Sequence, residues 1–154
     1  MSLVKTRIHI EGKLPEVFAL SRRQLADAAR AFAEKSAARV RGVFREVTVI
    51  LQNDAESDEV HRAVMATAGA TDVITQRYDA LPGEAPGVYG ELYVNTDQAL
   101  RVAKRFGRWQ PRRELLLYVA HGMDHLSGAD DITAEGYSQM RRRELRWLSS
   151  LALK

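Results

Sequence analysis

The sequence predicts an α+β domain in which a four-stranded mixed sheet is covered by about five helices. Short runs that alternate apolar and polar residues, typical of half-buried strands, are separated by longer stretches of helix-forming residues. Their order along the chain is β-α-β-α-β-β-α-α-α. The 154 residues, 45% of them hydrophobic, are enough for a single domain (1–154) that buries a core without disulfides.

Four segments have the pattern of strands. Residues 3–10 alternate apolar and polar side chains, and residues 46–52 are dense in β-branched residues. Residues 71–75 and 90–96 give the third and fourth strands. The segment between them, 77–90, contains several Pro and Gly residues and is predicted as an exposed loop.

The first two helices are predicted from their start signals. Ser21 precedes a long Ala-rich stretch of strong helix formers. We expect its buried stripe to contain Leu25, Ala28, Ala29 and Phe32, which recur at helical spacing. Ser57 is followed by two acidic residues, the pattern of an N-cap and a first turn, and Gly69 is expected to end that helix.

Three further helices follow the fourth predicted strand. One covers 96–106 and is ended by Gly107. Pro111 is suited to the first position of the next helix, which is strongly apolar, and is therefore predicted to be central and buried, and to end at Gly128. A last helix is predicted over 133–151.

The composition excludes several classes of protein. There is no cysteine, so a disulfide scaffold and a thiolate metal site are both excluded. No stretch approaches the roughly 20 apolar residues that cross a bilayer, and the first residues lack the apolar core of a signal peptide. We expect a cytoplasmic protein with no membrane partner and no small-molecule cofactor.

Positive charge is concentrated in two stretches of a chain whose net charge is +3. Residues 101–113 include several basic residues and no acidic one, and residues 141–146 hold four arginines around one glutamate. Such stretches are often solvated helix faces. Because both flank the segment described next, they also indicate a surface for a polyanion.

That segment contains two of the four histidines of the chain, His121 and His125. Residues four apart lie on one face of a helix, so both imidazoles can reach one metal ion. Gly128 then favours a sharp turn of the chain, and Asp130 and Asp131 follow it as candidates for a third ligand. The alternative is that the histidines are ordinary surface residues and the aspartates cap the next helix.

Two His ligands and one Asp leave an open coordination position, which is typical of a catalytic zinc site. Manganese, iron or nickel also suit nitrogen and oxygen ligands. Position 122 is Gly, where a zinc peptidase with an HExxH helix has its general-base Glu. The sequence therefore argues against a peptidase, whereas a metal-bound water remains available as a nucleophile.

The segment HGMDHLSGADD resembles the signature HGxLHLxGxDH of the YbeY family. The positions that match in register are His121, Gly122, His125, Leu126, Gly128 and Asp130. Residues 71–75 resemble the TDVLSF strand of the family, and residues 90–94 resemble its GDIxI strand. Met140 and Glu144 lie where the family has a Met and a Glu. The resemblance covers roughly residues 45–150.

This resemblance implies a zinc-dependent endoribonuclease that acts in 16S rRNA 3′-end maturation and ribosome quality control. It implies one zinc ion per chain, a cytoplasmic location and association with rRNA in the small ribosomal subunit. The register favours Asp131 over Asp130 as the ligand beside His121 and His125. Five basic residues are candidates for contacts to the RNA backbone: Arg101, Lys104, Arg105, Arg112 and Arg113.

The sequence also departs from the family pattern at four positions. Asp131 replaces the third His, and Met65 stands where the family has an Arg. Asp124 replaces a Leu; we expect it to face solvent or a basic neighbour, with a general-base role as the alternative. Glu91 stands in place of an Asp, as a candidate catalytic residue or an exposed strand residue. The missing Arg and the replacement of the third His by Asp131 favour a second hypothesis, a non-catalytic assembly factor that binds rRNA or a small-subunit protein.

Overall fold

The computed structural model describes residues 5–65, 71–105 and 110–153, and within these it contains one sheet, five α-helices and a short 3₁₀ helix. In chain order, the elements are β1 (Arg7–Glu11), η1 (Glu16–Phe18), α1 (Arg22–Val40), β2 (Phe44–Gln52), α2 (Asp54–Met65), β3 (Val73–Asp79), β4 (Val88–Asn95), α3 (Thr96–Arg105), α4 (Pro111–Leu126) and α5 (Ala134–Ser149). The predicted element order is confirmed.

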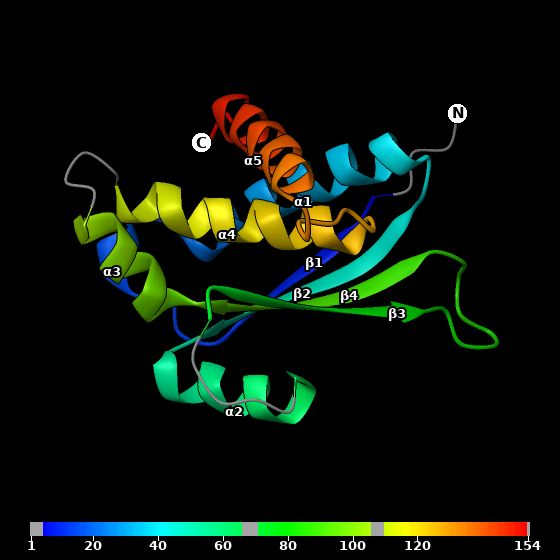
Figure 1. The fold of residues 1–154 in the computed structure, drawn as a ribbon. Helices are drawn as coiled ribbons and strands as arrows, with labels where there is room; N and C mark the ends of the chain where they lie inside the picture. The colour runs from blue at the N-terminus through cyan, green and yellow to red at the C-terminus, as the bar shows by residue number, and fades with distance from the viewer. Residues whose placement is uncertain (1–4, 66–70, 106–109, 154) are drawn as a thin grey trace.

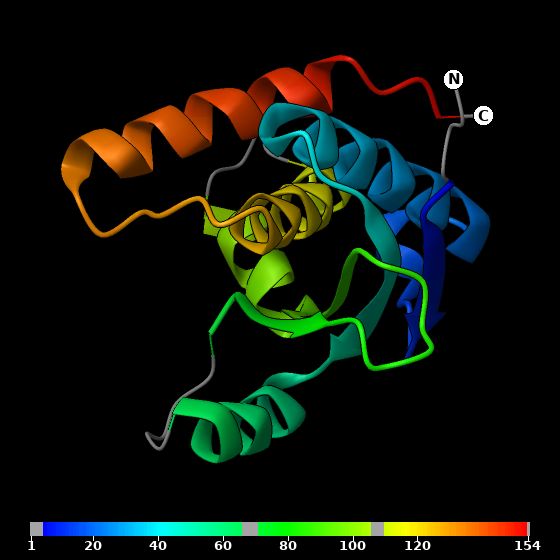
Figure 2. The same cartoon turned by 90° about the vertical axis from the view of Figure 1, so that its right-hand side faces the viewer.

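The strands form a mixed sheet in the order β1-β2-β4-β3. β1 and β4 both run parallel to β2, and β3 runs antiparallel to β4 at the edge of the sheet. Helices α1, α4 and α5 lie on one side of the sheet and α2 lies on the other (Figure 1). The turned view in Figure 2 shows α5 as the outermost layer, above α1 and α4. The predicted α+β fold with a four-stranded mixed sheet is therefore correct.

α4 is the central helix, as its apolar sequence predicts. It packs against α1, α5, α3 and the strands β3 and β4, and its side chains from Leu115 to Ala120 are all buried. Pro111 occupies the first turn, where its missing N–H costs no hydrogen bond. No helix within the described ranges has both the length and the apolar character needed to cross a membrane.

α1 begins as predicted at Ser21. The Ser21 hydroxyl accepts a hydrogen bond from the Gln24 N–H, and the Gln24 side chain accepts one from the Ser21 N–H. The predicted stripe of Leu25, Ala28, Ala29 and Phe32 is fully buried. Burial of this stripe, rather than helix propensity alone, fixes α1 beside α4.

The start of α2 differs from the prediction. The cap is Asn53: its side chain accepts a hydrogen bond from the Glu56 N–H (2.9 Å), and Glu56 accepts one from the Asn53 N–H (3.1 Å). Ser57 lies inside the helix and is buried, with its hydroxyl 3.4 Å from the carbonyl oxygen of Thr71. Asn and Ser are comparable caps, and the acidic residues after each of them made the choice ambiguous. The predicted helix ends at Gly69 and Gly107 lie outside the described residues.

The hairpin between β3 and β4 is longer than predicted. Residues from Arg77 to Asp79 pair with residues from Val88 to Gly90, so the connecting loop is 80–87 rather than 77–90. Cross-strand pairing thus extends both strands into a segment that its Pro and Gly content marked as a loop.

α4 approaches the sheet closely at two glycines. A Cβ atom on Gly122 would lie 2.9 Å from a methyl carbon of Leu92, and one on Gly90 would lie 2.7 Å from a methyl carbon of Leu126. A larger side chain at either position would require the leucine, or α4 itself, to shift. The two glycines therefore allow the second half of α4 to lie close to β4.

Candidate metal centre

His121 and His125 lie one turn apart on α4, as the spacing predicts. Their Nε2 atoms are 3.1 Å apart, and the rings meet edge to face at 82°. Both side chains are partly buried, with exposed fractions of 12% and 28%. Two imidazole nitrogens at this separation can bind the same ion.

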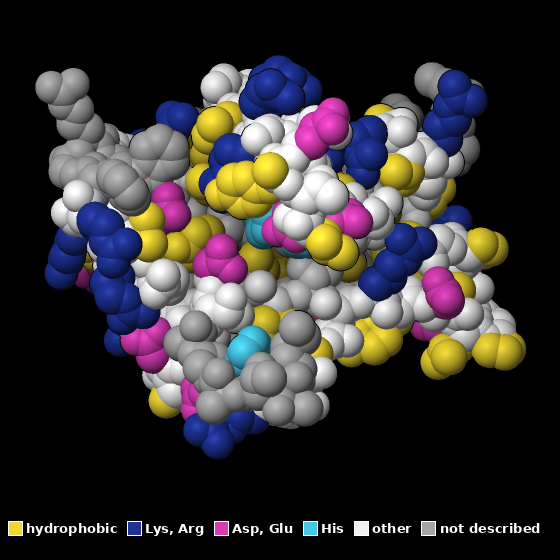
Figure 3. Space-filling model, viewed as in Figure 1, with side chains coloured by type: hydrophobic (Ala, Val, Ile, Leu, Met, Phe, Trp, Pro, Cys, Tyr) yellow, Lys and Arg dark blue, Asp and Glu magenta, His cyan; other side chains and the backbone are white. Residues whose placement is uncertain are grey.

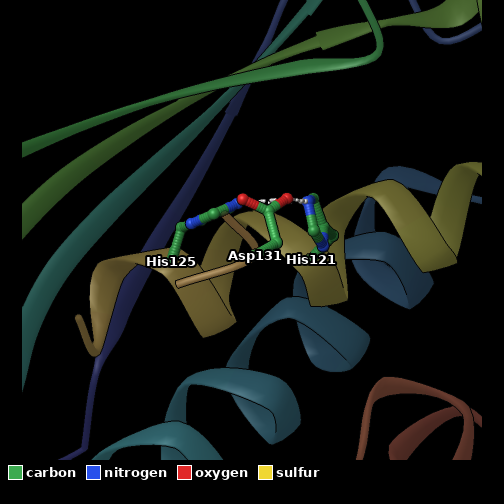
Figure 4. Close-up of side chains that lie close together, drawn as sticks. All are labelled: His121, His125 and Asp131. Carbon is green, nitrogen blue, oxygen red and sulfur yellow. Dashed lines mark hydrogen bonds and ion pairs between the residues drawn. The ribbon is translucent and has the colours of Figure 1, made fainter. Parts of the chain in front are cut away.

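The turn after α4 brings Asp131 back to the two histidines. Gly128 has a φ of +91°, which favours glycine, and its N–H donates to the carbonyl oxygen of His125 (2.9 Å). The Asp131 Oδ2 atom then lies 3.5 Å from Nε2 of each histidine, and its carboxylate lies between the rings (Figure 4). Asp130 is exposed, and its Oδ1 accepts a hydrogen bond from the Ile132 N–H (2.6 Å).

His121, His125 and Asp131 fit a divalent metal ion. One ligand atom from each lies within 4.8 Å of the others. Two imidazole nitrogens and one carboxylate oxygen are a ligand set that zinc accepts, and a set of three leaves one position open. The structure thus brings together the three residues predicted as ligands. It also distinguishes the roles of the two aspartates: Asp131 faces the histidines, and Asp130 stabilises the turn.

The outer nitrogen of each histidine already has an acceptor. His121 Nδ1 lies 2.8 Å from Oε2 of Glu144, which α5 carries into the core, and His125 Nδ1 lies 3.1 Å from the carbonyl oxygen of Ala129. With a proton on each Nδ1, both Nε2 lone pairs point to the space beside Asp131. These contacts assign the tautomer that metal binding needs.

Glu144 is completely buried, and its Oε1 atom has no hydrogen-bond partner among the described residues. Burial raises the pKa of its carboxyl above the usual value, and His121 partly opposes this. Burial lowers the pKa of His121, but the hydrogen bond to Glu144 and its charge outweigh burial, so the net shift is upward. Both net shifts favour keeping a proton between His121 and Glu144.

Asp124 faces away from the metal centre. It is fully buried, and both its oxygens accept hydrogen bonds from Nε and Nη2 of Arg143 on α5, at 2.9 to 3.2 Å. Arg39 of α1 lies 3.8 Å from the same carboxylate. The expectation of a basic neighbour is correct, whereas the alternative of solvent exposure is wrong. The ion pair links α4 to α5 beside the ligand loop.

Glu91 lies on the other face of the sheet. Its neighbour Leu92 packs against Gly122 of α4, and side chains alternate along a strand, so Glu91 points towards the side of α2. There it accepts a hydrogen bond from the hydroxyl of Tyr78 (2.7 Å), which raises the pKa of Tyr78 to about 12. The structure does not bring Glu91 to the histidines.

The predicted RNA-contact residues lie at the opposite end of α4. Nine residues, about 14 Å of helix, separate Arg112 from His121. Arg101 donates two hydrogen bonds to Asp54, at 2.9 and 3.0 Å, and therefore holds α3 to α2. Arg101 is itself exposed, as are Lys104, Arg105 and Arg113, and Arg112 is half-buried.

A cleft of about 370 Å³ runs beside the metal centre along the edge strand β3. Its lining residues are His61, Thr71, Val73, Ile74, Thr75, Arg77 and His125. Arg77 donates to the carbonyl oxygen of Leu126 (2.9 Å), so it stands at the C-terminal end of α4. In Figure 3 histidine side chains are visible near the centre of this hollowed face, with acidic side chains around them. The side chain of Met65 lies outside the described residues.

Sequence reasoning did not find three of the residues that support the site. Arg143 and Arg39 were not connected with Asp124, and His61 was not placed near the centre. Glu144 was matched to the family without a role. Each depends on contacts between distant segments, and the only signal in the sequence was the cluster of arginines around Glu144.

The fold and the ligand set define an α+β protein with a metal centre on its central helix. Over residues 11–152 the chain matches the family model described as Endoribonuclease YbeY. A Rhodopirellula baltica protein named Endoribonuclease YbeY is 35% identical over 136 residues, which span 87% of this chain and 66% of that protein. A Chlamydia pneumoniae protein of the same name is 32% identical over 113 residues, 71% of each chain. The chain belongs to the YbeY family.

The fold is also that of a solved structure. The solution structure of a Thermotoga maritima protein matches with a TM-score of 0.58 and 23% identity, and the match covers 92% of this chain and 87% of the other. The curated relative from Rhodopirellula is longer, and the match spans just under two thirds of it.

Replacing Asp131 by Ala is expected to weaken zinc binding by more than about 100-fold, because residues that only orient a ligand typically change affinity by about 10- to 100-fold. The matched variant Asp130→Ala keeps nearly the wild-type affinity, since Asp130 only stabilises the turn. Competition with a chromophoric chelator measures both. A larger loss of zinc affinity in Asp130→Ala than in Asp131→Ala would show that Asp130, and not Asp131, is the ligand.

The Asp124–Arg143 pair gives a second prediction. Asp124→Leu leaves Arg143 without its partner in a site where its side chain is only 17% exposed, and should lower the free energy of unfolding by about 3–5 kcal/mol. The double variant Asp124→Leu/Arg143→Leu should recover most of this. Urea unfolding of metal-free protein measures both effects. Additive losses in the double variant would show that the pair does not act as a unit.

Proposed function

We propose that this protein is a zinc-dependent endoribonuclease that acts in 16S rRNA 3′-end maturation and ribosome quality control, in the cytoplasm and on the small ribosomal subunit. The observation that carries the proposal is the convergence of His121, His125 and Asp131 in a chain of the YbeY family. Its relatives from Rhodopirellula and Chlamydia are named endoribonucleases.

In this proposal Nε2 of His121, Nε2 of His125 and a carboxylate oxygen of Asp131 hold one zinc ion. A zinc ion held by these residues would supply a Lewis acid and would lower the pKa of a water molecule towards ~7. Glu144 keeps the Nδ1 proton of His121, so that Nε2 stays available and the ring keeps its orientation. The turn at Gly128 determines how closely Asp131 approaches the histidines.

Asp131 adds a negative charge that a neutral histidine would not add. A carboxylate ligand reduces the positive charge felt by the substrate and by water, so we propose a weaker Lewis acid and a higher pH optimum than a three-histidine site would have. The shorter side chain also requires the loop to lie close to α4. The two backbone hydrogen bonds from Gly128 and Ala129 to the end of α4 are consistent with that position.

RNA contacts away from the centre are proposed for the basic end of α3 and α4. Lys104, Arg105 and Arg113 are exposed there. Contacts to RNA phosphates depend on positive charge and not on the base sequence. Arg112 completes this group. Arg101 contributes through the position of α3, because its guanidinium is bound to Asp54.

A second candidate function is a non-catalytic assembly factor that binds rRNA or a small-subunit protein. Two observations favour it: Glu91 points to the other face of the sheet, and Asp124 is bound to Arg143. Neither of the two carboxylates considered as a general base therefore reaches the metal centre. If the protein is an endoribonuclease, RNA cleavage would depend on zinc and its ligands.

Zinc-loaded wild-type protein should cleave a single-stranded RNA that carries the 3′ end of a 16S precursor, and His121→Ala should lose at least about 99% of this activity. Removal of zinc with a chelator should abolish cleavage and re-addition should restore it. His9→Ala is the control, because His9 lies on β1, where its side chain pairs with Glu46 and takes no part in the proposed metal centre. RNA binding with undiminished affinity but without cleavage would favour the assembly factor.

A further inference from the structure

One face of α5 is directed at the metal centre. Glu144 reaches His121 from this face. Residues three or four apart on a helix share a face, so Arg141 and Tyr137 continue the same stripe towards the start of α5. Side chains in a helix lean towards its N-terminus, and the start of α5 follows directly on the loop that carries Asp131. The Arg141 side chain therefore extends beside the ligand loop.

Arg141 differs from Arg143 and Arg101 in its partners. Arg143 is bound to Asp124, and Arg101 is bound to Asp54. Arg141 has no ion pair with a carboxylate in the described part of the chain, and its guanidinium contacts Tyr137. Its Nη2 donates to the Tyr137 hydroxyl (3.2 Å), and its Cζ lies 5.6 Å from the centre of the tyrosine ring. The guanidinium is therefore held in place without being neutralised.

The position of Arg141 on α5 brings its charge to the side of the metal centre. Glu144, one turn further along the same face, lies 2.8 Å from His121 Nδ1. Arg141 is three residues before Glu144 on this helix, so its guanidinium adds a positive charge on the side of the centre that faces α5.

We propose that Arg141 binds a phosphate of the RNA substrate at the edge of the metal centre and that Tyr137 positions its guanidinium for this contact. The inference rests on the proposed endoribonuclease function and adds a substrate-binding catalytic residue to it. A planar guanidinium matches the oxygens of a phosphate with two parallel hydrogen bonds. It would also offset the negative charge of Asp131 as the phosphate approaches.

The test compares Arg141→Gln with Arg23→Gln. Arg23 lies on α1, is exposed and loses the same charge, but belongs to neither basic stretch of the chain. Binding of a single-stranded RNA oligonucleotide to metal-free protein is measured at several salt concentrations. Cleavage by the zinc-loaded protein gives kcat and KM. Zinc content and thermal melting establish that the variants fold and keep the metal.

Arg141→Gln is expected to reduce the slope of log Kobs against log salt by about 0.7, the value for one phosphate contact to a single strand. It should lower kcat/KM by about 100-fold, with much of the loss in kcat, because the contact strengthens as charge develops on the phosphate. Arg141→Lys should recover part of the activity, and Tyr137→Phe should show a smaller loss. Arg23→Gln should remain within about twofold of wild type.

Equal effects of Arg141→Gln and Arg23→Gln would overturn the inference. Cleavage by the wild type would leave the proposed function intact in that case. A wild type that binds RNA without cleaving it would end the endoribonuclease proposal, and the salt slopes would still decide whether Arg141 contacts a phosphate. A wild type that does not bind RNA would overturn both.

Discussion

The buried hydrogen bond between Glu144 and His121 is the interaction on which the rest of the site depends. It joins α5 to α4 in the core and fixes the imidazole nitrogen that faces the metal position. The chain between the same two helices carries Asp131, so the docking of α5 also determines where the third ligand can reach. The Asp124–Arg143 pair strengthens the same docking about one turn further along α4. Ligand geometry is therefore a property of helix packing.

Most of the fold could be predicted from the sequence because the hydrophobic periodicity agrees with the residues that begin and end helices. Ser21, Pro111 and Gly128 each mark a helix end, and the apolar stripe of α1 follows the period of the helix. The prediction failed where two local signals competed. Asn53 and Ser57 both have the pattern of a helix cap. The Pro and Gly residues after β3 predict a loop, whereas the pairing of β3 with β4 extends both strands into this segment.

The metal ligands could be predicted because a helix and a turn bring them together over eleven residues. The supporting residues could not, because 19 residues separate Asp124 from Arg143 and 23 separate His121 from Glu144. Glu91 shows a different limit. Helices cover both faces of β4, so alternation in the sequence does not say which face holds the metal centre. The packing of Leu92 on Gly122 shows which face of β4 lies towards the metal centre.

The central claim is that His121, His125 and Asp131 form one zinc site whose geometry Glu144 maintains. A crystal structure of zinc-loaded protein, with anomalous diffraction collected at the zinc edge, tests it most directly. The predicted result is a single strong peak about 2.0–2.2 Å from both Nε2 atoms and from an Asp131 oxygen, with His121 Nδ1 still bound to Glu144. A peak coordinated by Asp130, or an ion bound without one of the histidines, would contradict the account.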